Sequence, residues 1–172
     1  HDSGDSTSLI SDKIVSVFED KSGVIWVGDI SGGINRFDRV NDSFKHYIKS
    51  IPCKKLFEDS EGILWIGTSA GLYRYHPKED KFLPYFDPES DVGHLDIINI
   101  IEDDERNLWM HNNSELLRVN RATKETYVYS TKFGIAENSL TPLGFYKNRK
   151  GELVLNHQKG FYTFYPEDLE VN

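Results

Sequence analysis

The sequence predicts an all-β fold: a β-propeller segment of about four blades, each a four-stranded antiparallel sheet, that forms part of a larger propeller. Two observations predict this fold. An apolar strand, a tight turn opened by aspartate and a strand centred on tryptophan occur together three times, and a fourth copy has Val154 in place of the tryptophan. The tryptophans Trp26, Trp65 and Trp109 recur at intervals of about 40 residues, the period of a unit of four short strands in a radial repeat.

The first and last strands of each copy also align between the repeats. Inner strands of mostly apolar residues are expected at 14–18, 53–57, 97–101 and 142–146. Outer strands are expected at 43–47, 81–85 and 125–129. No outer strand is expected for the fourth copy, because the chain stops soon after Leu169. That blade is expected to be incomplete or to be completed by another strand.

The repeats predict a single array, because one small sheet cannot bury both of its faces and must share its core with its neighbours. The array covers residues 1–172, and its blades are expected at about 9–50, 51–92, 93–136 and 137–172. An uncovered apolar blade face and open sheet edges are expected at the ends of the array, which predicts a homodimer.

The composition excludes several classes of protein. A formal net charge of −8 argues against a nucleic-acid partner, which would need a clustered basic surface. The one cysteine, Cys53, excludes an internal disulfide, and it aligns with Ile14 and Ile97, which predicts a buried, inert thiol. No apolar run approaches the roughly 18 residues of a membrane helix, and no signal region opens the sequence. Any export signal or anchor is therefore expected outside this chain.

The turns opened by aspartate have a structural explanation. Asp20 and Asp59 open turns that end at Gly23 and Gly62. An aspartate at the start of a turn usually bonds backbone amides two residues on, and glycine supplies the positive φ that such turns require. A calcium loop would need more oxygen donors than these four residues provide. Asp20, Gly23, Asp59 and Gly62 are therefore expected to be structural.

The tryptophans are expected to be structural as well. Because Trp26, Trp65 and Trp109 repeat at the structural period, they are expected to pack between adjacent blades; the alternative is that they stack on sugars. The histidines show no zinc-ligand spacing, and the sequence has no nucleophile elbow and no phosphate-binding glycine loop. No catalytic residues, metal ligands or cofactors are expected.

The candidate binding residues lie where the repeats differ from one another. The loop after the second strand is Thr68-Ser69-Ala70 in the second repeat but is larger and more polar in the third and fourth. In propellers, loops of this class open around the central channel, where ligands usually bind. Amides and imidazoles suit a hydroxyl-rich ligand, and a lysine suits a sulfate or uronate. The candidate ligand-binding residues are His111, Asn112, Asn113, His157, Gln158, Lys159 and, on an inner strand, Lys54. The alternative is that loops simply tolerate polar substitutions.

The repeats at 18–28 and 57–75 resemble the two-component regulator propeller repeat, in which Glu-Asp, two residues and Gly precede Leu-Trp-Ile-Gly-Thr and then Gly-Leu with an aromatic residue. The resemblance extends from about Ser8 to Leu169, and the third repeat departs from it at Arg106 and at 111–113. In that family, such repeats build the periplasmic sensor regions of hybrid two-component regulators, typically from Bacteroidota. Those regulators sense glycan fragments and control polysaccharide-utilisation genes.

The resemblance implies a non-catalytic extracytoplasmic sensor module that binds an oligosaccharide and signals to a histidine kinase located outside this chain. It also implies further propeller blades and a C-terminal immunoglobulin-like domain as partners within the parent protein. The alternative function is a protein-interaction or dimerisation scaffold without a ligand of its own. A propeller enzyme such as a lyase is disfavoured, because no pair of catalytic groups stands out in the sequence.

Overall fold

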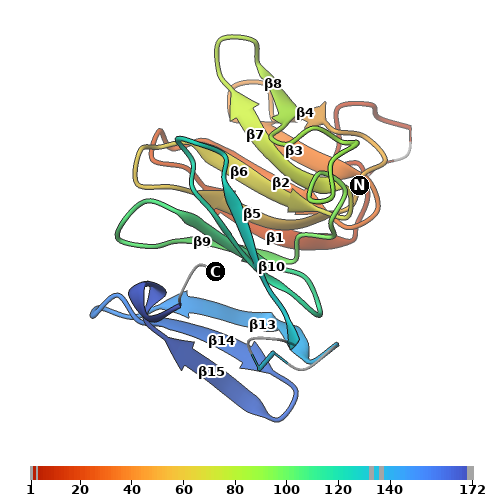
Figure 1. Ribbon diagram of the computed structural model, residues 1–172. Helices are drawn as coiled ribbons and strands as arrows, with labels where there is room; N and C mark the ends of the chain where they lie inside the picture. The colour runs from red at the N-terminus through yellow and green to blue at the C-terminus, as the bar shows by residue number, and fades with distance from the viewer. Residues whose placement is uncertain (1, 3, 132–133, 136–137, 170–172) are drawn as a thin grey trace. The chain divides into compact units, whose positions relative to one another are not determined.

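The structure, a computed structural model, describes residues 2, 4–131, 134–135 and 138–169 (Figure 1). The chain is all-β and divides into two compact units, His1–Ile97 and Ile98–Asn172. Each unit holds two antiparallel sheets, and together they supply the four blades predicted from the repeats. A short 3-10 helix, Pro166–Asp168, follows the last strand. No helix among the described residues is long and apolar enough to cross a membrane.

The first unit contains two four-stranded sheets whose strands pair in chain order. Sheet 1 consists of β1 (Ile14–Glu19), β2 (Ile25–Asp29), β3 (Gly33–Asp38) and β4 (Ser43–Tyr47). Sheet 2 consists of β5 (Cys53–Glu58), β6 (Leu64–Thr68), β7 (Gly71–His76) and β8 (Lys81–Pro84). Strands β1 and β2 pack against β5, so the inner strands of the two sheets lie side by side, as in neighbouring propeller blades (Figure 1).

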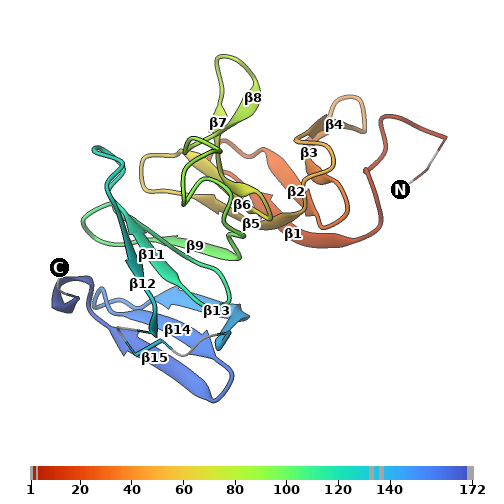
Figure 2. The ribbon, with the colours of Figure 1, turned by 45° about the vertical axis from the view of Figure 1, so that its right-hand side comes forward.

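The second unit contains a four-stranded and a three-stranded sheet (Figure 2). Sheet 3 consists of β9 (Asn99–Glu102), β10 (Leu108–His111), β11 (Leu116–Val119) and β12 (Thr126–Tyr129). Sheet 4 consists of β13 (Leu140–Lys147), β14 (Leu153–His157) and β15 (Gly160–Phe164). Strand β13 packs against β9. Within the described residues sheet 4 has no outer strand, as predicted, whereas the predicted boundary at 136–137 lies outside the described residues.

One strand begins later than its pattern predicts. The apolar run suggests a strand from Ile97, but β9 begins at Asn99. The reason lies in the backbone hydrogen bonds: the Ile97 amide donates to Thr68 O at 2.9 Å, away from the β9 ladder. Residue 97 therefore belongs to the link between blades, and the ladder with β10 becomes regular only at the pair Asn99 and His111.

Other parts of the first unit approach its sheets closely where the sequence has glycine. A Cβ atom added at Gly28 would lie 2.6 Å from Cys53 Sγ, and one added at Gly67 would lie 2.5 Å from Ile97 O. Cys53 is fully buried there, as predicted, and burial raises the pKa of its thiol to about 12. The thiol is therefore protonated at neutral pH and is not a nucleophile.

Each turn opened by aspartate or asparagine needs a residue with positive φ. Gly23, Gly62 and Gly151 supply it at φ 83°, 79° and 84°. In the third repeat Arg106 takes this position at φ 66° and donates its amide to Asp103 O at 3.2 Å. A side chain in this left-handed region costs roughly 1–2 kcal/mol relative to the right-handed form.

We expect Arg106→Gly to raise the free energy of unfolding by up to about 1 kcal/mol, because relief of the left-handed strain exceeds the added chain entropy of glycine. Urea unfolding of the variant and the wild type measures the difference. The matched control is Gly62→Ala, which introduces a Cβ at the equivalent position and should destabilise the protein. A less stable Arg106→Gly variant would show that contacts of the arginine side chain outweigh the strain.

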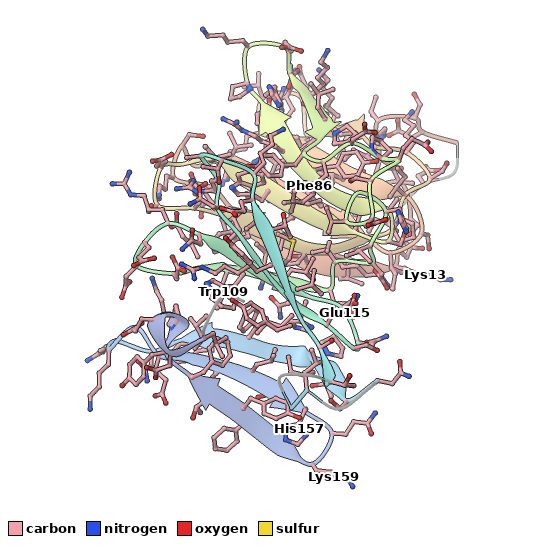
Figure 3. The ribbon with its side chains drawn as sticks, viewed as in Figure 1. Lys13, Phe86, Trp109, Glu115, His157 and Lys159 are labelled. Carbon is pink, nitrogen blue, oxygen red and sulfur yellow. The ribbon has the colours of Figure 1, made fainter. Side chains whose placement is uncertain are left out.

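The three tryptophans lie in the protein core, each with at most 1% of its surface exposed. Trp26 packs between sheets 1 and 2, with its ring centroid 5.0 Å from that of Tyr75 and 5.5 Å from that of Phe82. Trp109 packs between sheets 3 and 4, 5.4 Å from the ring of Phe164 (Figure 3). Because their rings are covered, the tryptophans have no free face on which a sugar could stack.

The aspartate of each turn also bonds the tryptophan six residues later. The indole Nε1–H groups of Trp26, Trp65 and Trp109 donate to the aspartate Oδ2 atoms at 2.8, 2.7 and 2.7 Å. The other carboxylate oxygen accepts backbone amides of the turn. In the fourth copy Val154 replaces the tryptophan and Asn148 replaces the aspartate, keeping only the bonds to the turn. The aspartate that opens the turn and the tryptophan that it binds are therefore replaced together in the fourth copy.

An arginine side chain also lies over the indole ring in each of the first three repeats. The guanidinium carbons of Arg36, Arg74 and Arg118 lie 6.0, 5.9 and 5.8 Å from the tryptophan ring centroids, within the range of cation–π attraction. The equivalent residue on β15 is Thr163. The fourth blade thus lacks all three members of the aspartate–indole–arginine group.

Asp80 lies at the centre of a network that joins the two sheets of the first unit. Its carboxylate accepts hydrogen bonds from Tyr47 Oη at 2.7 Å, Tyr75 Oη at 2.6 Å and Arg36 Nη1 at 3.0 Å. Lys45 pairs with its other oxygen. Tyr47, Arg36 and Lys45 belong to sheet 1, whereas Asp80 belongs to the β7–β8 turn of sheet 2. The network therefore ties the outer parts of the two blades together.

Candidate functional site

The structure brings the variable loops of the third and fourth repeats together in the second unit. The Asn113 carbonyl accepts the Leu140 amide at 3.0 Å, and Leu140 pairs with His157 across β13 and β14. Leu140 therefore contacts both the loop after β10 and the end of β14, and it brings the two loops close together. His157 and Lys159 lie at one end of the β14–β15 hairpin (Figure 3).

Two residues absent from the predicted set hold these loops together. Ser114 Oγ lies 3.2 Å from Asn138 Oδ1 and accepts the Asn138 amide at 3.1 Å. Gln158 donates its side-chain amide to Asn138 O at 2.9 Å and its backbone amide to Ser139 O at 2.9 Å. Asn138 has φ 52°, a conformation that asparagine tolerates well. Gln158 therefore supports the loops, and its amide donor is already engaged.

The residue three positions after each tryptophan, or after Val154, has a turn-forming role in all four repeats. Its side chain accepts the backbone amide two residues on, in an Asx-type turn. The bonds measure 2.6 Å for Asp29, 3.0 Å for Thr68, 2.8 Å for Asn112 and 3.2 Å for His157. The polar character of Asn112 and His157 thus follows in part from the turn that each one forms.

Asn112 is fully engaged in its loop. Its Oδ1 atom accepts the amides of Ser114 and Glu115, both at 2.8 Å, and its Nδ2 atom donates to Glu115 Oε2 at 2.9 Å. The next residue, Asn113, is exposed, and its side chain makes no hydrogen bond to a described residue. Of these two neighbouring asparagines, Asn113 is the one available to a ligand.

The expectation that His111 lies in an open loop is wrong. His111 is the last residue of β10, is fully buried, and lies edge-on to Phe145 with ring centroids 5.5 Å apart. It occupies the position held by Gly28 and Gly67, where the inner strand of the next blade approaches. Burial lowers the pKa of the imidazole, which favours the neutral form. Its Nδ1 atom lies 2.9 Å from Asn112 O, and its Nε2 atom has no hydrogen-bond partner among the described residues.

His157 is held by its neighbours but keeps one free nitrogen. Its ring stacks on Tyr162 with centroids 4.4 Å apart, and Nδ1 accepts the Lys159 amide at 3.2 Å. That bond places the proton of the neutral ring on Nε2, where it can be donated to a ligand. Lys159 is exposed, and its ammonium pairs with no described residue. Sequence reasoning missed Tyr162, whose diagonal position across the hairpin could have indicated the contact.

Lys54 belongs to the first unit, on β5. Its ammonium lies 3.8 Å from Asp96 Oδ2 in a partly exposed ion pair. Lys54 therefore has an ion-pair partner within its own unit.

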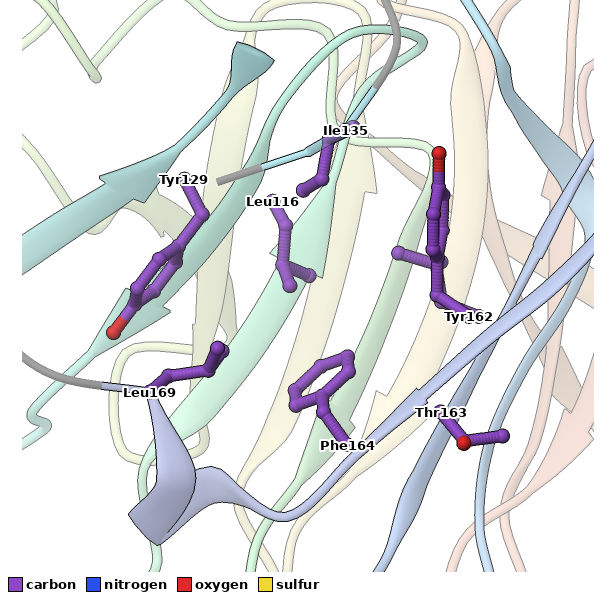
Figure 4. A pocket seen from close by; sticks show the side chains of 8 residues that line it. Leu116, Tyr129, Ile135, Tyr162, Thr163, Phe164 and Leu169 are labelled. Carbon is purple, nitrogen blue, oxygen red and sulfur yellow. The ribbon is translucent and has the colours of Figure 1, made fainter. Parts of the chain in front are cut away.

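A cavity of about 220 Å³ lies between sheets 3 and 4 (Figure 4). Its lining is mainly apolar and includes Leu116, Tyr129, Leu155, Tyr162, Phe164 and Leu169. Burial raises the pKa of Tyr129. Few polar groups face this space, so it does not suit a hydroxyl-rich ligand.

A second hollow, of about 370 Å³, lies in the first unit beside the N-terminal segment, and most of the residues that line it are polar. Asp5, His46 and Lys49 are among the residues that line it. No sequence pattern indicates this site, because its residues come from separate segments near 2–10, 31–32 and 46–50. No group of three or more potential metal ligands occurs among the residues that the structure describes.

Two pairs of consecutive antiparallel sheets, with their inner strands side by side within each unit, define a β-propeller module. The two-component regulator propeller family matches residues 8–31 and 50–70, which include the first two turns and tryptophans. These two stretches therefore match the two-component regulator propeller repeat, which their residues resemble. Comparison with curated proteins gives no match.

Solved structures share the fold over almost the whole chain. The extracellular domain of BT3049 from B. thetaiotaomicron, assigned as a hybrid two-component system, has a TM-score of 0.81 and 18% identity, covering 98% of this chain and 23% of that one. The extracellular domain of BT4673 from the same organism, assigned to the same class, has a TM-score of 0.78 and 23% identity, covering 97% and 25%. PorZ of Porphyromonas gingivalis, a surface component of the type-IX secretion system, has a TM-score of 0.60 and 14% identity, covering 89% and 24%. The chain thus spans about a quarter of the length of these structures.

Proposed function

We propose that this chain is a non-catalytic extracytoplasmic sensor module of a hybrid two-component regulator, and that it binds an oligosaccharide and signals to a histidine kinase outside this chain. The match of the first two repeats to the two-component regulator propeller family supports the proposal that the chain is part of such a regulator. Two structural neighbours are extracellular domains of proteins assigned to such systems, which supports a periplasmic location. The carboxylates of the first three turns are engaged by indoles, which supports a non-catalytic role.

The observation that carries the ligand proposal is the joining of two polar loops by the bond between Asn113 and Leu140 and the pairing of Leu140 with His157. Of the predicted residues, Asn113, His157 and Lys159 keep groups that can reach a ligand, because Asn112 and Gln158 are engaged within the chain. An amide, an imidazole N–H and an ammonium can together bind hydroxyl and carboxylate or sulfate oxygens. The site therefore favours an acidic oligosaccharide.

We expect Lys159→Ala to weaken the binding of an acidic glycan fragment by about tenfold, since a hydrogen bond to a charged group contributes about 1.5–3 kcal/mol. His157→Ala should weaken it less. Lys159→Ala should unfold within about 0.5 kcal/mol of the wild type, because Lys159 is exposed in the β14–β15 turn. His157→Ala should lose more stability, because it removes the bond to the Lys159 amide and the stacking on Tyr162. Calorimetric titration of a panel of neutral, uronic and sulfated fragments measures the affinities.

The matched control is Lys49→Ala, which removes an exposed lysine from the polar hollow of the first unit. Unchanged affinity in the control together with weakened binding in Lys159→Ala supports the loop site. Weakened binding in Lys49→Ala alone would place the ligand in the hollow and contradict the loop site.

The alternative function is a protein-interaction or dimerisation scaffold that has no ligand of its own. The observation that favours it is the number of large apolar side chains exposed on the sheets, among them Val17 at 69% and Phe161 at 65%. If the chain is a scaffold, titration with any glycan fragment should give no heat of binding, and the protein should associate with itself or with another protein.

A further inference from the structure

His111 places an ionisable side chain where the other repeats have a neutral residue. The equivalent positions hold Gly28, Gly67 and Asn156. The imidazole of His111 lies at the contact between β10 and β13, where it is fully buried and edge-on to Phe145 with ring centroids 5.5 Å apart. The contact between sheets 3 and 4 therefore contains a group that can gain a charge.

The hydrogen bond of His111 determines which nitrogen carries the proton of the neutral ring. Nδ1 lies 2.9 Å from the carbonyl oxygen of Asn112, which can only accept, so Nδ1 is the donor. Nε2 then carries a lone pair and has no hydrogen-bond partner among the described residues. A second proton would place a positive charge and an unpaired N–H group at this buried atom, which is costly.

No charged side chain in the described part of the chain forms a hydrogen bond or an ion pair with His111 that would offset such a charge. The elements packed against it are β9, β11, β13, the link before β9 and the loop after β10. The charged residues of these elements form other pairs: Glu102 with Arg121, Arg118 with Glu105, Lys147 with Asp104, Asp96 with Lys54, and Glu115 with the Asn112 side chain. Tyr146 of β13 is mostly exposed. Burial accordingly lowers the pKa of His111, and the bond to Asn112 O raises it by less.

The loop that carries part of the polar site begins at the residue after His111. His111 Nδ1 bonds the carbonyl of Asn112, and the next carbonyl, that of Asn113, accepts the Leu140 amide at 3.0 Å. Leu140 in turn pairs with His157 across β13 and β14. A movement of His111 away from β13 would therefore displace Asn113 relative to His157.

We propose that His111 is a positioning residue of the polar loop site, and that its protonation favours an open form in which β10 and β13 separate and the loops no longer bind ligand. In the closed form the ring is neutral and holds the loop through Asn112. In the open form Nε2 meets water and takes up a proton. Acid therefore favours the open form, and a ligand that needs both loops favours the closed one. The ligand part of this proposal rests on the proposed function, whereas the opening itself needs no ligand.

Amide hydrogen exchange followed by NMR tests the opening without ligand. The pKa of a solvated histidine is about 6.5, and that of His111 in the closed form is lower. The neutral ring therefore contributes stability that is complete above about pH 6.5 and is lost as the pH falls toward the lowered value. The protection factor of the Leu140 amide should be about tenfold lower near pH 5.5 than near pH 7.5. The control amide is that of Tyr85, which donates to Leu72 O at 2.9 Å in the first unit and should keep its protection.

His111→Asn separates the protonation from the hydrogen bond. The asparagine Nδ2 group can replace Nδ1 as the donor to Asn112 O, but it does not titrate in this range. The protection factor of the Leu140 amide in this variant should therefore be the same at both pH values, whatever its level. His111→Gln also removes the titration and serves if the asparagine variant does not fold.

The same measurement with a bound fragment tests the effect on the site. The probes are the uronic and sulfated fragments of the titration panel. A fragment present at 100 times its Kd should raise the Leu140 protection factor about a hundredfold, because it binds only the closed form. If no fragment binds in the calorimeter, the proposed function fails, and the exchange of the free protein still decides the opening.

Three results would overturn the proposal. Equal protection of the Leu140 amide at the two pH values in the wild type would show that His111 does not control the contact. Equal losses in the wild type and in His111→Asn would assign the opening to another group. A fragment that binds but leaves the Leu140 protection unchanged would show that binding does not need the closed form.

Discussion

Trp65→Ala is expected to lower the free energy of unfolding by about 3–5 kcal/mol, enough to unfold much of a marginally stable protein. The indole is 1% exposed, and its ring centroid lies 4.9 Å from that of Tyr85. The substitution removes this packing, the bond from Nε1 to Asp59 Oδ2 at 2.7 Å, and the surface beneath Arg74. Chemical denaturation of the variant and the wild type measures the loss.

Trp65→Phe separates the hydrogen bond from the packing. Phenylalanine keeps an aromatic ring but has no donor for Asp59, so this variant should lie between the wild type and Trp65→Ala in stability. If Trp65→Ala keeps the melting temperature of the wild type but loses glycan binding, the indole is a binding platform and its structural assignment is wrong.

Asp80→Asn is expected to lower the free energy of unfolding by about 2–3 kcal/mol, because hydrogen bonds to a charged group contribute about 1.5–3 kcal/mol and several donors share this carboxylate. The amide keeps one acceptor but loses the charge that holds Arg36 and Lys45. The expected loss of unfolding free energy is small for a carboxylate with this many donors, because the Asp80 side chain is 33% exposed and solvent screens its charge.

The stability that Asp80 contributes should decrease at low pH. Partial burial raises the pKa of Asp80, but hydrogen bonds from Lys45, Tyr75 and Tyr47 outweigh it and hold the pKa well below its usual range. A depressed pKa contributes stability that is present above the unfolded value of about 3.9 and is lost as the pH falls through the folded value. The difference between wild type and Asp80→Asn should therefore be constant from about pH 6 to 8 and shrink below about pH 4.

The matched control for this experiment is Asp42→Asn. Asp42 occupies the equivalent place in the β3–β4 turn and has a similar φ of 50°, compared with 46° for Asp80. Its side chain makes no hydrogen bond to a described residue, so its substitution should change stability little at any pH. Equal losses in both variants would show that the turn, and not the network, accounts for the effect of Asp80.

The turns and most strands could be predicted because their signals are local. The turns from Asp20 to Gly23 and from Asp59 to Gly62 depend on a short side chain and on one residue that tolerates positive φ. Short runs of mostly apolar residues after such turns then define strands of five residues, as β2 and β6 show. The three strands that the described residues form in sheet 4 were predicted from the same signals.

The candidate site was less predictable, because loop composition does not reveal which groups are already engaged. Asn112 and Gln158 look like ligand-binding amides in the sequence, but bonds to Glu115 and Asn138 occupy them. The position of His111 suggests a loop, yet its side chain is enclosed where the next inner strand approaches. The enclosure of His111 depends on Phe145 of the next repeat, and the Gln158 bond depends on a residue 20 positions earlier, so no local pattern contains them. The Asn112 bond to Glu115 is local, but composition does not show that it forms.

The sequence by itself determined the repeating unit, its turns, its strand order and the burial of its tryptophans, because each follows from periodicity and short-range backbone chemistry. Only the tertiary structure decided that Asp59 binds the indole of Trp65, that Asp80 joins two sheets, and that His157 keeps a free donor beside Asn113. Those features depend on which side chains meet across sheets and loops, and packing alone sets such distances.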